Sequence, residues 1–317
     1  MTWRFRGLAA AAVAFVLDGA GWFYASGRVA SECGGALDDL RRQGWEVVSE
    51  APQRTGWPFA AGVRYRQVRL DGASAGVPAA WRADDVDIRI RATQPGTLLL
   101  IPSRMQQVRL GGGDWVEVAA SLQLAVQADS AEAVGRDLVV QLPGGPVGIA
   151  GLHANLRGRT LQFDLAGIEA GPLLSARHIM AETVLTGPLL PAPASATAAA
   201  AWRDGGGTLQ VNTLQLDAGD LQASASGAAG LDPALQPVLN LTARVQGYRT
   251  ALDRLAQAGM IQTSAAVAAK AVLGLLSGRD PGAPATLPIR MAGGIVSVAG
   301  FPLLRLPAVD WTAEPRQ

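Results

Sequence analysis

Two histidines are the first candidates for chemistry, because imidazole is both a common metal ligand and a common general base. His153 and His178 lie far apart in the sequence, and neither belongs to an HxH, HxxxH or HExxH spacing. Each falls in a strand-like stretch, and a metal site would require them to converge with carboxylates. We therefore expect ordinary sheet histidines and no metal site.

A GxSxG match at residues 72–76 places Ser74 where a serine nucleophile could stand. The nucleophile elbow that this motif forms requires a strand before the serine and a helix after it. Pro78 and Trp81 follow instead, and they make a poor start for a helix. We interpret the motif as a loop of small residues between two strands.

Phosphate binding and acid–base catalysis find little support in the sequence. Lys270 is the only lysine and no GxxxxGK[ST] sequence occurs, which excludes a phosphate-binding loop of that kind. The glycine run at residues 111–113 precedes a predicted strand and not a helix. Aspartates cluster at residues 84–87 and 217–220, where alternating apolar neighbours are typical of turns and solvated strand edges. We expect a protein that is not an enzyme and that needs no cofactor.

The composition indicates a β-rich chain without a nucleic-acid partner. Hydrophobic residues make up 49% of the 317 positions, enough for a real core, and 38 glycines and 19 prolines supply turns. A net charge of +1 gives no field that would attract nucleic acid. Cys33 is the only cysteine, so an intramolecular disulfide and a cysteine-based zinc site are both excluded.

The N-terminal segment, residues 1–27, predicts a membrane anchor. Residues 7–25 are apolar except for Asp18, follow two arginines and end close to three consecutive aromatic residues. This length suits one bilayer crossing, and the arginines predict a cytoplasmic N-terminus, an inner-membrane location and a periplasmic remainder. The alternative is a cleaved signal peptide, with secretion of the remainder to the periplasm.

Residues 28–187 are interpreted as the N-terminal half of a β-rich domain. A short amphipathic helix is expected over residues 26–44. Apolar and polar residues then alternate in strand-like runs, which predicts one apolar and one polar face. These runs include residues 63–70, 86–90, 122–126 and 161–165. The alternation in the first run slips by one step, which predicts a β-bulge near Gln67.

The C-terminal part begins after a change of composition. Residues 188–206 are rich in Pro, Ala and Gly and predict a linker or a long loop. Residues 207–317 form a C-terminal β-rich half with helices near residues 248–278, and the Gly293-Gly294 pair predicts a tight hairpin. The predicted fold class is mainly β (α+β): an extended, curved antiparallel sheet of repeated hairpins, with an N-terminal anchor helix and a C-terminal helical pair.

One run supplies the candidate ligand face. Leu122, Leu124 and Val126 alternate with more polar neighbours and form part of a one-sided apolar surface. A sheet with one apolar face needs a cover, and the predicted helices are too few to cover all of it. This face could therefore accept acyl chains.

A short aromatic motif, Gly56-Trp57-Pro58-Phe59, supplies the second group of candidate residues. Pro58 forces extended geometry on Trp57 and removes one donor from the sheet ladder. We expect Trp57, Pro58 and Phe59 to cap one end of the core. The alternative is that the aromatic pair contacts a ligand.

The order of these features resembles a family of uncharacterised Gram-negative proteins, the domain of unknown function 2125. The likeness rests on the anchor with its aromatic end, the motif at residues 56–59, residues 227–232 and 241–255, an Ala-rich helix, and the Gly294 hairpin that leads to residues 301–303. A more distant architectural likeness to AsmA-type envelope proteins implies an apolar groove for lipid and a role in outer-membrane homeostasis. Neither resemblance implies a catalytic residue.

Together these features predict a non-enzymatic protein of the inner membrane. We expect it to bind or shield lipid, or another apolar ligand, in a sheet groove for envelope maintenance. The alternative is a structural or assembly partner of other membrane proteins that has no ligand of its own and uses Asp18 and an exposed sheet edge.

Overall fold

The computed structural model describes residues 2–74, 77–110, 113–142, 145–171, 174–187, 196–257, 263–276, 284–306 and 308–309, and for residues 2–20 it describes the backbone alone. The helices are α1 (Thr2–Arg42), α2 (Ala196–Asp204), α3 (Tyr248–Gln257) and α4 (Thr263–Leu276). The first strands are β1 (Glu46–Val48), β2 (Gln53–Thr55), β3 (Ala60–Ser74), β4 (Val77–Arg91), β5 (Gln94–Pro102), β6 (Met105–Leu110), β7 (Val116–Val126), β8 (Ser130–Leu142) and β9 (Gly145–Arg157). The remaining strands are β10 (Thr160–Ala170), β11 (Leu174–Thr186), β12 (Thr208–Ala218), β13 (Leu221–Leu231), β14 (Pro237–Gln246), β15 (Ala285–Ala292), β16 (Ile295–Val298) and β17 (Phe301–Arg305).

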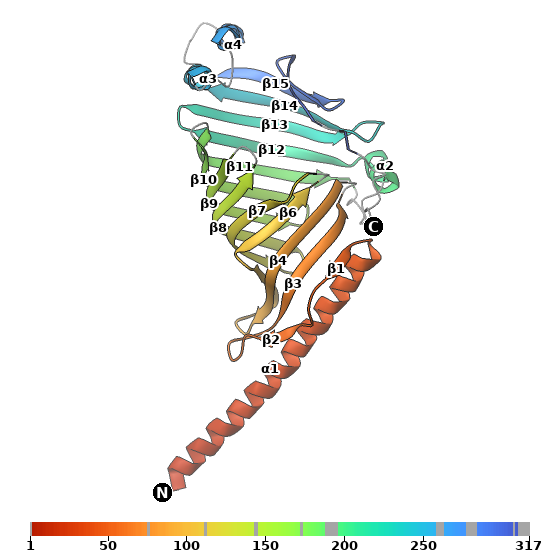
Figure 1. Ribbon diagram of the computed structural model, residues 1–317, viewed down its shortest axis with the longest axis vertical. Helices are drawn as coiled ribbons and strands as arrows, with labels where there is room; N and C mark the ends of the chain where they lie inside the picture. Colours follow the sequence, from red (N-terminus) through yellow and green to blue (C-terminus); the bar gives the residue numbers. More distant parts are fainter. Residues whose placement is uncertain are drawn as a thin grey trace.

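The strands form one curved antiparallel sheet in which most strands pair with the strands before and after them in the chain (Figure 1). β1 and β2 both pair with β3 at one edge. β5 and β6 act as one long strand interrupted at Ser103-Arg104, because both pair with β4 on one side and with β7 on the other. β11 pairs with β12 along most of its length, so the two predicted β-rich halves belong to a single sheet.

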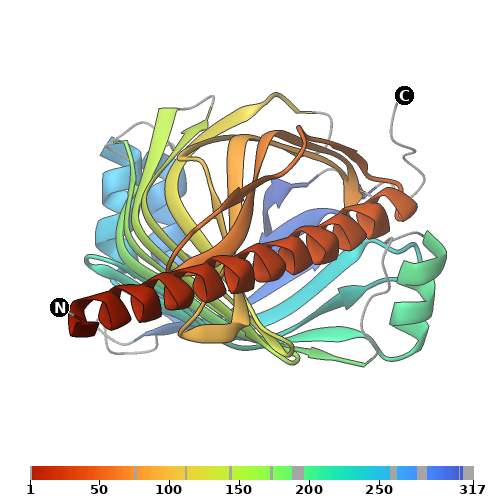
Figure 2. The same cartoon turned by 90° about the horizontal axis from the view of Figure 1, so that it is seen from below.

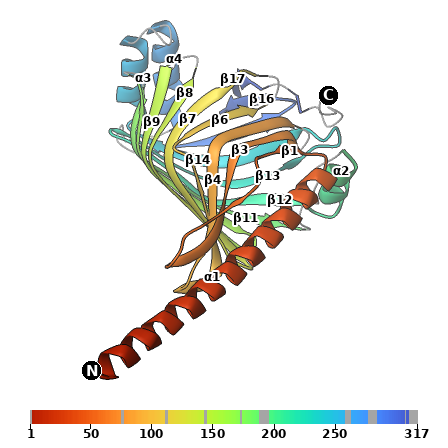
Figure 3. The ribbon, with the colours of Figure 1, turned by 60° about the horizontal axis from the view of Figure 1, so that its bottom comes forward.

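The first helix contains both the predicted anchor segment and the short helix predicted over residues 26–44. α1 is continuous from Thr2 to Arg42, and Gly44, with a φ of +87°, follows its C-terminal end. Gly27 lies inside the helix without breaking it, and the Ser26 hydroxyl donates to the Phe23 carbonyl one turn earlier at 3.1 Å. Figure 3 shows the N-terminal half of α1 extending beyond the sheet.

Within the described residues, no helix combines the length and the apolar character that a membrane crossing requires. Most of the predicted anchor, residues 1–27, lies outside the residues whose side chains are described.

The strand pairing is irregular at Gln67, where the sequence predicts a β-bulge. Gln67 has a φ of +51°, and the β3–β4 register passes over Gln67 and Asp84. Tyr65 and Val68, on either side of the irregularity, both pack into one buried cluster, as the slipped alternation predicts. The pairing register also leaves out one residue on each of β8, β9, β10 and β11. These unpaired residues are Asp137, Ala150, Gly167 and Arg177.

One face of the sheet carries apolar side chains on most of its strands. Residues that are paired across antiparallel strands point to the same side, so the register traces this face from strand to strand. On β14, Leu241 and Ala243 are 8% and 3% exposed whereas Thr242 between them is exposed. On β14 the apolar face is therefore the sheltered one, whereas Leu156 and Leu161 on the same face of β9 and β10 are 43% and 40% exposed.

Helices cover this face at its two ends. α1 packs on β3 and β4 through a cluster that includes Val29, Cys33 and Val63, and Figure 2 shows it crossing the lower end of the curled sheet. At the other end, α3 and α4 pack around Tyr248 and Leu287. Between these ends, in the described chain, the principal contacts of β7 to β12 are with neighbouring strands.

The C-terminal predictions are confirmed in outline, with one correction. α3 and α4 occupy the region predicted to be helical, and Gly293 and Gly294, both with positive φ, turn β15 into β16. The predicted linker, residues 188–206, contains α2, because a run of alanines favours helix. Residues 188–195 of that linker lie outside the described residues.

Candidate functional site

An apolar cavity of about 310 Å³ lies between α1 and the sheet. Val29, Cys33 and Leu37, spaced four residues apart, line it from one face of the helix. Its sheet wall comes from β3, β4 and β5. The side chains of that wall include Tyr65, Val68, Leu70, Trp81, Val86, Ile88, Leu98 and Leu100. The helix wall was not among the residues predicted to contact a ligand, although the four-residue spacing of its apolar side chains is visible in the sequence.

The ionisable side chains that line the cavity are either neutral or ion-paired. Burial, with a smaller contribution from the charge of Glu32, raises the pKa of the Cys33 thiol to about 11. Burial also raises the pKa of the Tyr65 phenol. Glu32, at the edge of the cavity, is paired with Arg28 at 3.0 Å. Cys33 and Tyr65 therefore stay neutral near pH 7, which suits an apolar guest better than a charged one.

The predicted ligand face continues the cavity wall. Leu124 pairs with Leu100 and Val126 pairs with Leu98, so both lie on the same side of the sheet as the two lining leucines. Leu122 lies two residues before Leu124 on the same strand, and all three side chains are half-buried. The structure thus places the predicted residues beside the cavity, not within its lining.

From β7 the same face runs on across the sheet. The register connects Leu124 to Ala133, then to Ala154 and Phe163, and then to Ala181. It continues through Leu214, Ala225, Ala243 and Leu287. A continuous apolar track therefore extends from the cavity under α1 toward the cluster under α3 and α4.

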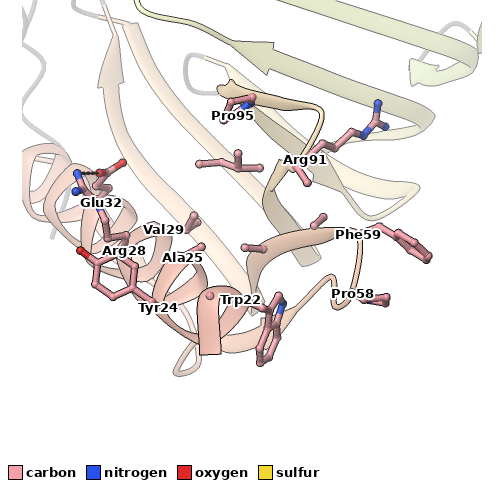
Figure 4. A pocket seen from close by; sticks show the side chains of 15 residues that line it. Trp22, Tyr24, Ala25, Arg28, Val29, Glu32, Pro58, Phe59, Arg91 and Pro95 are labelled. Atoms are coloured by element: carbon pink, nitrogen blue, oxygen red, sulfur yellow. Dashed lines mark hydrogen bonds and ion pairs between the residues drawn. The ribbon is translucent and has the colours of Figure 1, made fainter. Parts of the chain in front are cut away.

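A second, wider pocket of about 660 Å³ opens where α1 leaves the sheet (Figure 4). Trp22, Tyr24 and Arg28 line it from the helix, and Phe59 and Arg91 line it from the sheet side. Val29 and Glu32 line both this pocket and the apolar cavity, so the two spaces meet at that point of the helix.

The aromatic motif lies at the mouth of this second pocket. Phe59 is 84% exposed and Trp57 is 43% exposed, and the Trp57–Pro58 peptide bond is cis. Phe59 projects away from the domain, so the expectation that the aromatic pair caps the core does not hold for it. β2 pairs with the first residues of β3, and Figure 1 shows this pair of strands beside α1 at the lower end of the sheet.

The two histidines lie on the polar face of the sheet on either side of β10, whose Asp164 is directly opposite His153 in the register. His153 lies 2.8 Å from a carboxylate oxygen of Glu132, and His178 lies 2.5 Å from one of Asp164. No group of three or more metal-ligating side chains occurs among the described residues. The interpretation of residues 72–76 as a loop was wrong for residues 72–74, which belong to β3 and pair with β4 as far as Ser74–Val77, and residues 75–76 lie outside the described residues. A strand, β4, and not a helix follows Ser74.

The comparisons with known proteins identify the family. A family model described as "Uncharacterized protein conserved in bacteria (DUF2125)" matches residues 22–307. The match covers most of the chain, and the chain belongs to this family. It confirms the resemblance derived from the sequence. No curated protein and no solved structure matched the chain.

Proposed function

We propose that this protein is a non-enzymatic, membrane-anchored protein of the bacterial envelope that shelters an acyl chain against the apolar face of its sheet. The observation that carries the proposal is the continuity of that face with the cavity under α1, through the pairs Leu100–Leu124 and Leu98–Val126. The apolar run at residues 7–25 supports an inner-membrane anchor with the sheet in the periplasm.

The size and chemistry of the cavity fit a hydrocarbon chain. A space of about 310 Å³ is many times the roughly 10–15 Å³ that one water molecule needs by the same measure, so it has room for several methylene groups. Each buried methylene contributes about 0.8 kcal/mol, so even part of an acyl chain would gain several kcal/mol in this site. The rest of the chain would lie along Leu122, Leu124 and Val126, where the face is half-buried.

The test is to purify the full chain and to quantify the lipid that it retains, by native mass spectrometry and by lipid extraction. We expect about one lipid per protein in the unmodified chain and a loss of that lipid in Leu124→Asp, which places a charge on the apolar track. Gln123→Asp is the matched control, because Gln123 is exposed on the opposite face of the same strand.

Two results would contradict the proposal. One is an unmodified chain that retains no more lipid than Leu124→Asp when both give the same circular dichroism spectrum. The other is equal lipid loss in Gln123→Asp. A lipid-free chain that copurifies with one specific membrane protein would instead favour the structural or assembly role.

A further inference from the structure

Exposed aromatic side chains gather at one end of the molecule. Phe23 and Tyr24 on α1 are 56% and 70% exposed, and Trp57 and Phe59, in the turn between β2 and β3, are 43% and 84% exposed. We call these four residues the aromatic collar. Tyr24 and Phe59 both line the wider pocket, so the collar stands at the mouth of that pocket.

The collar is fixed relative to α1. The Trp22 indole N–H donates to the Thr55 carbonyl at 3.2 Å, which ties the helix to β2. The Arg54 guanidinium stacks over the Phe23 ring at 3.8 Å from its centroid. These contacts hold the turn that carries Trp57 and Phe59 at the level of residues 22–25 of the helix.

That level is the C-terminal end of the apolar run. A helix rises 1.5 Å per residue, so residues 7–25 span about 28 Å, close to the roughly 30 Å of a bilayer's hydrocarbon core. If the run crosses the membrane, residues 22–25 reach its outer boundary, and the collar lies at the same depth. Tyrosine and tryptophan prefer this depth because their rings are apolar and their polar atoms need water or headgroups.

The charges near the collar suit phospholipid headgroups. Arg54 and Arg91 are exposed beside the collar, and Arg91 lines the wider pocket. Arg28, also in the pocket, is paired with Glu32. Among the described residues neither Arg54 nor Arg91 forms an ion pair with a carboxylate, so both can face the region where lipid phosphates would lie.

We propose that the aromatic collar seats on the outer surface of the bilayer, so that the wider pocket opens directly onto phospholipid headgroups. An acyl chain then passes from the bilayer, past Val29 and Glu32, into the apolar cavity without crossing bulk water. This inference rests on the proposed anchor and on the proposed acyl-chain site, and it adds the surface through which the ligand enters.

The seating is tested with the full chain in vesicles of phosphatidylethanolamine and phosphatidylglycerol. A nitroxide label is attached to Phe59→Cys, and its collisions with oxygen, which concentrates in lipid, are compared with its collisions with a water-soluble nickel chelate. Leu142→Cys is the control, since Leu142 is 44% exposed and lies at the far end of β8, about 40 Å along that strand from Ser130. Native Cys33 is buried, so the unmodified chain reports any background labelling.

We expect the label at position 59 to meet oxygen several-fold more often, relative to the nickel chelate, than the label at position 142. Equal, water-like accessibility at both positions in membrane-bound protein would overturn the seating. That result would leave the acyl-chain proposal standing, because lipid retention is measured separately.

The entry route has its own test. Ala92 is exposed and lines the wider pocket, so Ala92→Trp should obstruct it. Ala128 is exposed in the turn before β8 and does not line that pocket, which makes Ala128→Trp the matched control. Loading of a fluorescent phosphatidylglycerol from vesicles should slow several-fold in Ala92→Trp alone. Unchanged loading would exclude this entrance, whereas no loading in any variant would contradict the acyl-chain proposal itself.

Discussion

Trp22 and Thr55 join the long helix to the sheet: the indole N–H of Trp22 donates to the main-chain carbonyl of Thr55 at 3.2 Å. The Thr55 hydroxyl in turn donates to Asp87 at 3.2 Å, and Asp87 pairs with Arg64 at 3.0 Å. A series of polar contacts thus links α1 to β2, β2 to β4, and β4 to β3. It fixes the direction in which α1 leaves the sheet.

The first prediction concerns this junction. Trp22→Phe keeps an aromatic ring but removes the donor to Thr55, and we expect a loss of about 1 kcal/mol in the free energy of unfolding. The collar should also become looser. Limited proteolysis near residues 52–59 should therefore be faster in Trp22→Phe than in the unmodified chain, and an unchanged cleavage rate would show that Thr55 does not depend on Trp22.

The second prediction concerns Asp87, which is 8% exposed. Asp87→Ala removes an acceptor from both Thr55 and Arg64, and leaving those donors without it should cost about 1–3 kcal/mol. Asp84→Ala is the control, since Asp84 is exposed on the same strand. Thermal unfolding followed by circular dichroism would measure both variants, and equal melting temperatures for the two would contradict this account.

The third prediction concerns the reactivity of Cys33. With its pKa raised to about 11, the thiol at pH 8 should be about 0.1% thiolate, against about 10% for an ordinary cysteine of pKa 9. Alkylation should be slow and should keep accelerating beyond pH 9. The raised pKa favours the folded state below about pH 9, and that contribution should be lost as the pH rises toward 11. An alkylation rate that levels off near pH 9 would mean that Cys33 is solvated.

The fourth prediction concerns two glycines on β13. A Cβ at Gly227 would lie 2.1 Å from the Asn240 carbonyl oxygen, whereas a Cβ at Gly230 would lie 3.9 Å from Val238. Gly227→Ala should therefore force β13 and β14 apart and cost more than about 1 kcal/mol. Gly230→Ala should change the stability by less than about 0.5 kcal/mol. Similar losses in both variants would refute the close strand approach at Gly227.

Much of the sheet could be predicted because its signals are local. Alternation at residues 86–90, 122–126 and 161–165 predicts strands that the structure contains, and the slipped alternation predicts the irregularity at Gln67. The Gly293-Gly294 turn follows from the freedom of glycine to adopt positive φ. The helix predicted over residues 26–44 is the C-terminal part of the longer helix α1, because each glycine inside a helix costs only about 1 kcal/mol and does not by itself end it.

The candidate site could be predicted only in part. Leu122, Leu124 and Val126 were recognisable as apolar positions on one face, but their continuity with the cavity depends on the β5–β7 register. The helix wall formed by Val29, Cys33 and Leu37 has a readable spacing, yet the sequence does not say which strands it meets.

The sequence by itself determined the β-rich class, the one-sided strands, the hairpin glycines and the membership of the family, because each depends on neighbouring residues or on a pattern along the chain. Only the tertiary structure decided that α1 is one helix packed on β3 and β4, that a cavity lies beneath it, and that Phe59 is exposed beside residues 22–25. Those features depend on contacts between residues far apart in the chain, and local patterns carry no information about which distant surfaces meet.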